Sequence, residues 1–95
     1  MRLIRKELVH EFSTKHSDAA SALDAWVQTV ETNMFKTPIE LKKTFGMADY
    51  VKPHTIFDVS GNKYRLISVV NYKLGTIFIK CILTHAEYDN GDWRD

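Results

Sequence analysis

Three apolar runs, separated by short turn sequences, most constrain what this chain can fold into. Apolar and β-branched residues fill 55–59, 63–72 and 76–84, with Gly61-Asn62 and Leu74-Gly75 between them. Valine, isoleucine, threonine and tyrosine favour strands, and a glycine-containing pair between two such runs is typical of a tight hairpin. The pattern predicts an antiparallel meander of three strands over the second half of the chain.

The first half carries helical spacing instead. Apolar residues predict a first helix over 6–15, and Ser17 or Asp18 is the expected N-cap of a second helix. The second helix has an apolar stripe, expected in the core, of Leu23, Trp26, Val27, Val30 and Met34. Thr37-Pro38-Ile39-Glu40 is a capping box that predicts a third short helix ending near Gly46, and residues 1–4 predict a brief edge strand.

Together these elements predict a single α+β domain over residues 1–95, with N-terminal helices packed on one face of a small, mostly antiparallel sheet. The N-terminus has no apolar signal-peptide region and no run is long enough to span a membrane, so we expect a soluble cytoplasmic protein. The single Cys81 is expected to be a small buried hydrophobe. No Cys/His spacing indicates a metal, and we expect no cofactor.

Register assigns the strand residues to two faces. A two-residue turn at Gly61-Asn62 pairs Asp58 with Arg65, and a tight turn at Leu74-Gly75 pairs Arg65 with Thr84. The predicted core face holds Phe57, Val59, Tyr64, Leu66, Val70, Ile77, Ile79, Cys81 and Leu83. The other, half-polar face holds Ile56, Asp58, Arg65, Ile67, Val69, Asn71, Phe78, Lys80, Ile82 and Thr84. Such a face is either a binding surface or the solvated side of the sheet.

Arg65, His85 and Tyr88 are the candidate catalytic residues. The guanidinium of Arg65 matches two oxygens of a phosphate, although a cross-strand ion pair with Asp58 is an equally physical use of it. His85 is able to act as a general acid or base if the strand ends at Thr84 or if the second turn has three residues; otherwise it lies on the core face. The Tyr88 hydroxyl is able to donate a proton to a leaving oxygen, or the ring is a packed surface aromatic.

Further residues are candidates for contact with RNA. The middle of the chain, 36–73, carries seven basic against three acidic residues (7 − 3 = +4), which suits a polyanion or simply a mixed solvated surface. The candidate backbone contacts are Lys52, Lys63, Asn71 and Lys80, and the candidate stacking rings are Tyr72, Phe78, Tyr88 and Trp93. His10, His16 and His54 lack ligand spacing, and we place them on helix surfaces or in the loop before the sheet.

Three segments occur in a fixed order along the chain: the predicted helix 37–45, the strand-turn-strand 57–67 (FDVSGNKYRLI) and the closing motif 84–89 (THAEYD). In these segments, and over essentially its whole length, the chain resembles the HigB toxins of the RelE-like superfamily. The resemblance implies a ribosome-dependent, metal-independent mRNA endonuclease in which Arg65 stabilises the phosphorane and His85 and Tyr88 transfer protons. It places Asn62 in the matched motif, where we expect a backbone role.

The resemblance also implies partners: a HigA-type antitoxin with a helix-turn-helix domain, the ribosome and mRNA, and operator DNA through the antitoxin alone. Two alternatives remain open from the residues. One is a non-catalytic module on the same fold that binds RNA, the ribosome or the antitoxin. The other is a small structural protein whose Arg65 serves only Asp58.

Overall fold

A five-stranded sheet in the order β1-β5-β4-β3-β2 forms the centre of the molecule. The computed structural model describes residues 1–94; Asp95, part of the predicted domain, lies outside the described residues. The strands are β1 (Arg2–Ile4), β2 (Asp49–Val51), β3 (His54–Val59), β4 (Tyr64–Asn71) and β5 (Thr76–Thr84). β1 pairs in parallel with β5, and the other neighbours are antiparallel. The predicted α+β fold and the N-terminal edge strand are confirmed, whereas β2 was not predicted.

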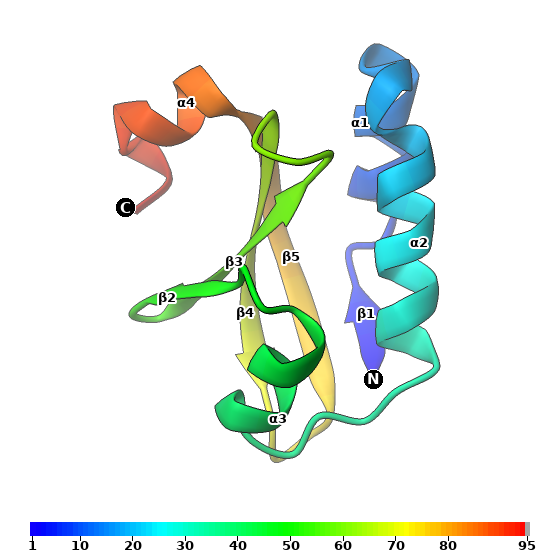
Figure 1. The fold of residues 1–95 in the computed structure, drawn as a ribbon, viewed down its shortest axis with the longest axis vertical. Coiled ribbons are helices and arrows are strands. Elements are labelled where there is room, and N and C mark those ends of the chain that lie inside the picture. The colour runs from blue at the N-terminus through cyan, green and yellow to red at the C-terminus, as the bar shows by residue number, and fades with distance from the viewer. Residues whose placement is uncertain (95) are drawn as a thin grey trace.

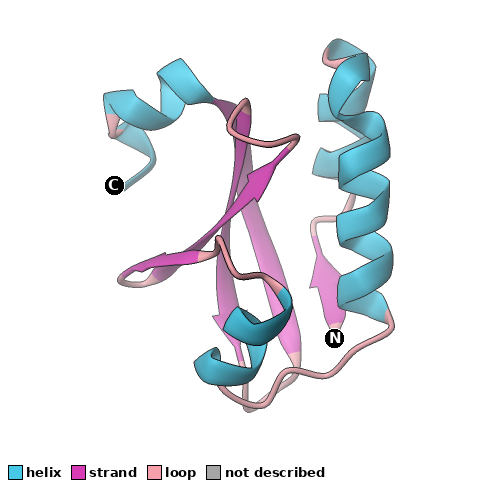
Figure 2. Cartoon of the chain, viewed as in Figure 1, coloured by secondary structure: helices cyan, strands magenta, loops and turns pink. Residues whose placement is uncertain are grey.

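Helices lie on both sides of this sheet. They are α1 (Glu7–Lys15), α2 (Ala20–Glu31), α3 (Pro38–Thr44) and α4 (His85–Asn90), with 3-10 turns at Ser17–Ala19 and Asp92–Arg94. α1 and α2 cover one face, whereas α4 and the C-terminal end lie beyond the other (Figure 1). Figure 2 shows the same separation, with the β2–β3 hairpin projecting on the side of α4. Within residues 1–94, no helix is long and apolar enough to cross a membrane.

The main core lies between the sheet and the helices α1 and α2. Its sheet side includes Phe57, Leu66, Ile77 and Ile79, all at most 1% exposed. Trp26 of α2 meets the ring of Phe57 edge-on at 5.2 Å. A smaller cluster of Ile56, Ile67 and Trp93 covers the opposite face. The sheet therefore has an apolar layer on each side, and the second layer ends at the C-terminal segment.

Two expectations about the second helix are wrong. α2 begins at Ala20, and the side chains of Ser17 and Asp18 do not cap it; the Asp18 carboxylate instead accepts hydrogen bonds from Lys63 and Tyr64. Met34 is 57% exposed because α2 ends at Glu31, before the stripe reaches it. The third helix is confirmed: Thr37 Oγ1 accepts from the Glu40 amide at 3.2 Å, and Pro38 occupies the first turn.

The first hairpin has the predicted register, and the second does not. Asp58 pairs with Arg65 as expected. In the second hairpin Asn71, rather than Lys73, pairs with Thr76. The Asn71 side chain explains the difference, since its Oδ1 accepts from the Leu74 amide while its carbonyl accepts from Gly75, both at 2.9 Å. This side-chain turn closes the strands earlier than a two-residue turn would.

A bulge then reverses the faces of the end of β5. Ile67 pairs with Cys81, but the next residue, Ser68, pairs with Ile79, so Lys80 is an extra residue on β5. Beyond the bulge, Arg65 pairs with Leu83 and not with Thr84. Cys81 and Leu83 pack on the small second cluster and Ile82 on the main core, the opposite of the predicted assignment. Up to Ile79 the predicted faces are correct.

Candidate active site

Arg65 lies on the sheet face that α4 covers, and its environment is the most polar part of that face. The residue is only 8% exposed. Its Nε forms an ion pair with Asp58 Oδ1 at 3.1 Å, the cross-strand pair that the sequence predicts. The carbon of the guanidinium lies 5.2 Å from the ring centre of Tyr88. A β-strand, its partner strand and α4 therefore meet at one cation.

The guanidinium is almost fully used within the protein. Nη1 donates to the carbonyls of Asn62 and Tyr64 at 3.1 and 3.2 Å, and Nη2 donates to Asn62 Oδ1 at 2.6 Å. Asn62 therefore contributes its side chain as well as the expected backbone. Arginine has five N–H donors, so within residues 1–94 one hydrogen of Nη2 is left for a ligand. Arg65 holds the β3–β4 turn (residues 60–63) and offers a single donor beyond it.

Helix α4 is short, and it is fixed at both ends. Thr84 and Glu87 form a reciprocal capping box, with Thr84 N donating to Glu87 Oε1 at 2.9 Å. Gly91 ends the helix with a left-handed φ of 85°. The amide of His85 donates to the Lys63 carbonyl at 2.9 Å, which joins the start of α4 to the β3–β4 turn. The strand thus ends at Thr84, as an accessible His85 requires.

His85 and Tyr88 have different surroundings on this helix. His85 Nδ1 lies 2.9 Å from Asp89 Oδ2, and both side chains are substantially exposed. A carboxylate on Nδ1 favours the tautomer that leaves Nε2 as the basic nitrogen. Tyr88 instead lies between the Arg65 cation and Trp93, whose ring is stacked on it at 5.2 Å and 9°. The arrangement joins an imidazole–carboxylate pair to a phenol beside a cation.

Asp18 connects the helical layer to the β3–β4 turn. Its carboxylate accepts from Tyr64 Oη at 2.8 Å and forms an ion pair with Lys63. The Ser60 hydroxyl donates to the backbone carbonyl of Asp18 at 3.3 Å. The hydrogen bonds from Lys63 and then Tyr64 hold the pKa of Asp18 below its ordinary 3.8, and the same bonds raise the pKa of both donors.

His54 is a buried part of this face and not a loop residue, so that expectation is wrong. It begins β3, is 5% exposed, and its ring meets Trp93 edge-on at 5.5 Å. Lys80 Nζ lies 3.2 Å from His54 Nε2 and donates to the Trp93 carbonyl at 2.6 Å. Burial, and then the charge of Lys80, lower the pKa of His54. The bulged Lys80 thereby anchors the C-terminal segment.

The predicted RNA-contact residues do not form one cluster. Lys63 lies in the β3–β4 turn beside α4, and Lys80 lies beneath Trp93. Asn71 is at the far end of β4 from Arg65, six residues and thus roughly 20 Å along the strand. Lys52 is exposed in the turn between β2 and β3. Lys63 is joined directly to the segment that holds His85, since its carbonyl accepts from the His85 amide.

Cys81, the single cysteine of the sequence, lies on the same side of the sheet as Arg65. Among the described residues, no group of three or more His, Cys, Asp and Glu could hold a metal ion. Cys81 is partly buried against the second cluster, and burial raises the pKa of its thiol. The raised pKa keeps the Cys81 sulfur in its neutral thiol form.

Sequence reasoning missed the supporting role of Asp18, Asp89 and Trp93. The spacing of Asp89, four residues after His85, is a usable signal once Thr84 and Glu87 are recognised as a helix start. No local pattern points to Asp18, whose partners are more than forty positions away.

Comparison with known proteins gives a consistent family. The HigB_toxin family, the RelE-like toxic component of a toxin–antitoxin system, matches residues 19–91. The chain is 30% identical over 92 residues to the mRNA interferase toxin HigB of Escherichia coli strain K12, covering 94% of this chain and 88% of that protein. It is 33% identical over 92 residues to the mRNA interferase HigB of Escherichia coli O6:H1, covering 94% and 89%. Because the family match and these relatives span most of the chain, the protein belongs to the HigB toxin family, the RelE-like toxic components of toxin–antitoxin systems.

Proposed function

We propose that this chain is an mRNA interferase, an endoribonuclease that cuts mRNA on the ribosome and thereby stops translation. The relatives named mRNA interferase support the activity. The observation that carries the proposal is the joining of Arg65, Tyr88 and the His85–Asp89 pair by one short capped helix. These groups supply a cation, a phenol and a base without a metal ion.

The reaction we propose is transesterification. The ribose 2′-oxygen attacks the adjacent phosphorus as the bond from phosphorus to the 5′-oxygen breaks, which leaves a 2′,3′-cyclic phosphate and a 5′-OH. His85 Nε2, oriented by Asp89, takes the 2′-OH proton, and the Tyr88 hydroxyl gives a proton to the leaving 5′-oxygen. Arg65 stabilises the phosphorane through its charge and the remaining Nη2 hydrogen. Lys52, Lys63, Asn71 and Lys80 are the proposed RNA contacts.

The proposed partner is a HigA-type helix-turn-helix antitoxin, which makes the operator contacts while the toxin contacts mRNA in the ribosomal A site. Family membership supports an antitoxin partner in general. A second candidate function is non-catalytic blockage of the ribosome on the same face. The near saturation of the Arg65 donors favours it, because a buried arginine with one remaining hydrogen is a weaker phosphate clamp than an open one.

Mapping of 5′-OH mRNA ends after brief expression separates the two functions. We expect new ends from the wild type and their loss in Arg65→Ala and in His85→Gln. The second variant matters because His85 is about half exposed, so its substitution leaves the core intact. Leu74→Ala, at a residue 73% exposed in the distant β4–β5 turn, is the matched control and should cut normally. Arrested growth with no new ends would favour the blocking function.

A further inference from the structure

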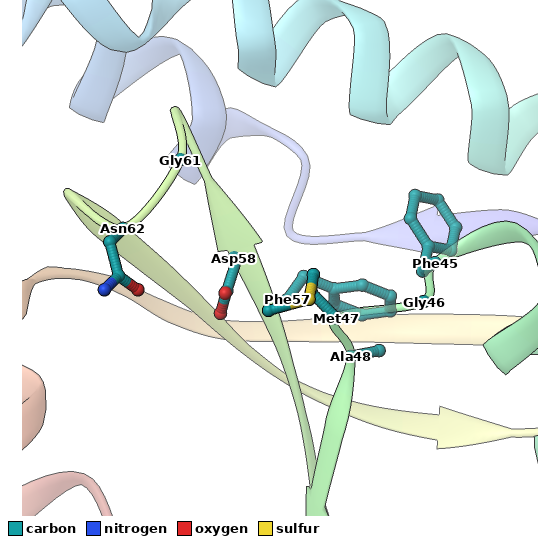
Figure 3. A pocket seen from close by; sticks show the side chains of 8 residues that line it. All are labelled: Phe45, Gly46, Met47, Ala48, Phe57, Asp58, Gly61 and Asn62. Carbon is teal, nitrogen blue, oxygen red and sulfur yellow. The ribbon is translucent and has the colours of Figure 1, made fainter.

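A groove beside the Arg65 site has the composition of a nucleobase pocket. It has a volume of about 510 Å³ and lies between residues 45–48 and the end of β3. Figure 3 shows the side chains of Asp58 and Asn62 on one side and those of Phe45, Met47 and Ala48 on the other. The groove therefore has an apolar wall and a polar rim.

The apolar wall is built in advance of any ligand. Phe45 packs edge-on against Phe57, with ring centres 5.0 Å apart. Both backbone polar groups of Ala48 are hydrogen-bonded. Its amide donates to the Phe45 carbonyl at 2.9 Å, and its carbonyl accepts from the Lys42 side chain. Met47 is nevertheless 75% exposed. An exposed, polarisable thioether on a fixed loop is a suitable surface for a flat ring.

The polar rim belongs to the residues that hold Arg65. Asp58 uses Oδ1 for Arg65, and Asn62 uses its Oδ1. In the part of the chain that the structure describes, Asp58 Oδ2 and Asn62 Nδ2 make no hydrogen bond, so the rim has an acceptor that no protein group uses and a second polar group beside it. The sheet edge is open here as well, since β2 pairs only with residues 54–56 of β3.

We propose that this groove binds the nucleobase next to the phosphodiester at Arg65 and selects bases with an exocyclic amino group. The Asp58 carboxylate accepts from such an amine, and the ring lies on Met47. Uracil, which lacks the amine, is disfavoured. The groove shares Asp58 and Asn62 with the Arg65 cluster, so a base one nucleotide from the bound phosphate reaches it. This inference rests on the proposed nuclease function.

The test compares the cleavage sites of Met47→Ala with those of the wild type, with Leu74→Ala as an equally exposed apolar control. Both substitutions lie on the surface, so folding is preserved. We expect Met47→Ala to keep cutting mRNA. At one position beside the cut, however, the enrichment of the preferred nucleotides should fall by at least about fivefold, because the base loses its packing on the thioether. Unchanged preference in Met47→Ala, or fewer cuts with the same preference, would overturn the base groove.

A binding measurement separates failure of this inference from failure of the nuclease. Purified protein is titrated with AMP, CMP, GMP and UMP while the backbone amide resonances of residues 45–48 and 61–62 are followed. Shifts with the three amino-bearing nucleotides, and at least about fivefold weaker ones with UMP, support the groove even if the wild type makes no new mRNA ends. No shifts with any nucleotide, or equal shifts with all four, contradict it.

Discussion

Arg65 combines a positive charge with near-complete burial, and its contacts explain how both are tolerated. A buried charge is costly unless it is paired and hydrogen-bonded. Here Asp58 supplies the counter-charge, and three oxygens of Asn62 and Tyr64 receive the remaining contacts. The same residue is thus a candidate catalytic group and the fastener of the β3–β4 turn.

Arg65→Lys should therefore lower both stability and activity. A lysine keeps the charge but has no planar fork, so it cannot reach Asp58 and the turn carbonyls together. We expect the free energy of unfolding to fall by about 1.5–3 kcal/mol, the range for hydrogen bonds to charged groups, as measured by urea titration. Arg94→Lys, at an exposed arginine over the Trp93 ring, should change it little. Equal stability of the two variants would contradict the fastening role.

At the scale of elements, α4 is a six-residue helix that depends on its caps. A helix this short has few internal hydrogen bonds, so its ends decide whether it forms. Thr84→Ala should cost about 1 kcal/mol, the usual value of an N-cap. Because α4 carries His85 and Tyr88, cleavage should fall as well. Thr14→Ala, which removes an exposed hydroxyl that donates to the His10 carbonyl within α1, is the control for both measurements. If Thr14→Ala lost cleavage as well, the loss in Thr84→Ala could not be assigned to the α4 cap.

Asp18 links two elements electrostatically, which gives the link a defined pH range. A lowered carboxylate pKa means that its stabilisation is present above the ordinary value of 3.8 and is lost as the pH falls through the folded pKa. The raised pKa of Tyr64 means that its part is present below 10.0 and is lost as the pH rises beyond that value. The link is therefore strongest between these limits.

Comparison of Asp18→Asn with the wild type from pH 3 to pH 8 tests this range. The urea midpoint of the wild type should exceed that of the variant above pH 3.8, and the two should converge below it. Asp24→Asn, at an exposed carboxylate on α2, serves as the control and should track the wild type throughout. A constant difference down to pH 3 would show that the carboxylate charge is not what holds the turn.

The sequence predicts elements best where local signals agree. The Gly61-Asn62 turn correctly sets the Asp58–Arg65 pair, and Thr37-Pro38 correctly starts α3. It fails where a side chain acts at a distance or outside its usual role. The Asn71 side chain accepts a hydrogen bond within the β4–β5 turn and so changes the register of the hairpin. The Asp18 side chain does not cap α2 but accepts hydrogen bonds from Lys63 and Tyr64. For the candidate site, the motifs select Arg65, His85 and Tyr88 as candidates, and the turn predicts the contact of Arg65 with Asp58. The contact of Tyr88 with Arg65 depends instead on the packing of α4, which no local pattern reports.

At the scale of the whole molecule, stability rests on the main core between the sheet and the helices. Leu66 is fully buried there. Leu66→Ala should cost about 2–5 kcal/mol, the range for a large-to-small change in a packed core. In a domain of this length that lowers the melting temperature by roughly 8 °C or more, which calorimetry measures. Leu74→Ala makes the same chemical change at an exposed leucine and should have the melting temperature of the wild type. A similar fall in melting temperature in both variants would mean that burial of Leu66 is not the cause.

The extra residue at position 80 has a consequence for how this chain can change. Side chains alternate along a strand, so an inserted or deleted residue exchanges inside and outside for everything that follows. The bulge absorbs that exchange, because Ile79 pairs with Ser68 and Cys81 with the adjacent Ile67, as they would in a strand without Lys80. If Lys80 instead paired with Ile67 in a regular strand, Cys81 and Leu83 would turn toward the helical layer, and the residues after them would change faces as well. The side of the sheet toward which β5 directs its last residues therefore depends on whether Lys80 is bulged or paired.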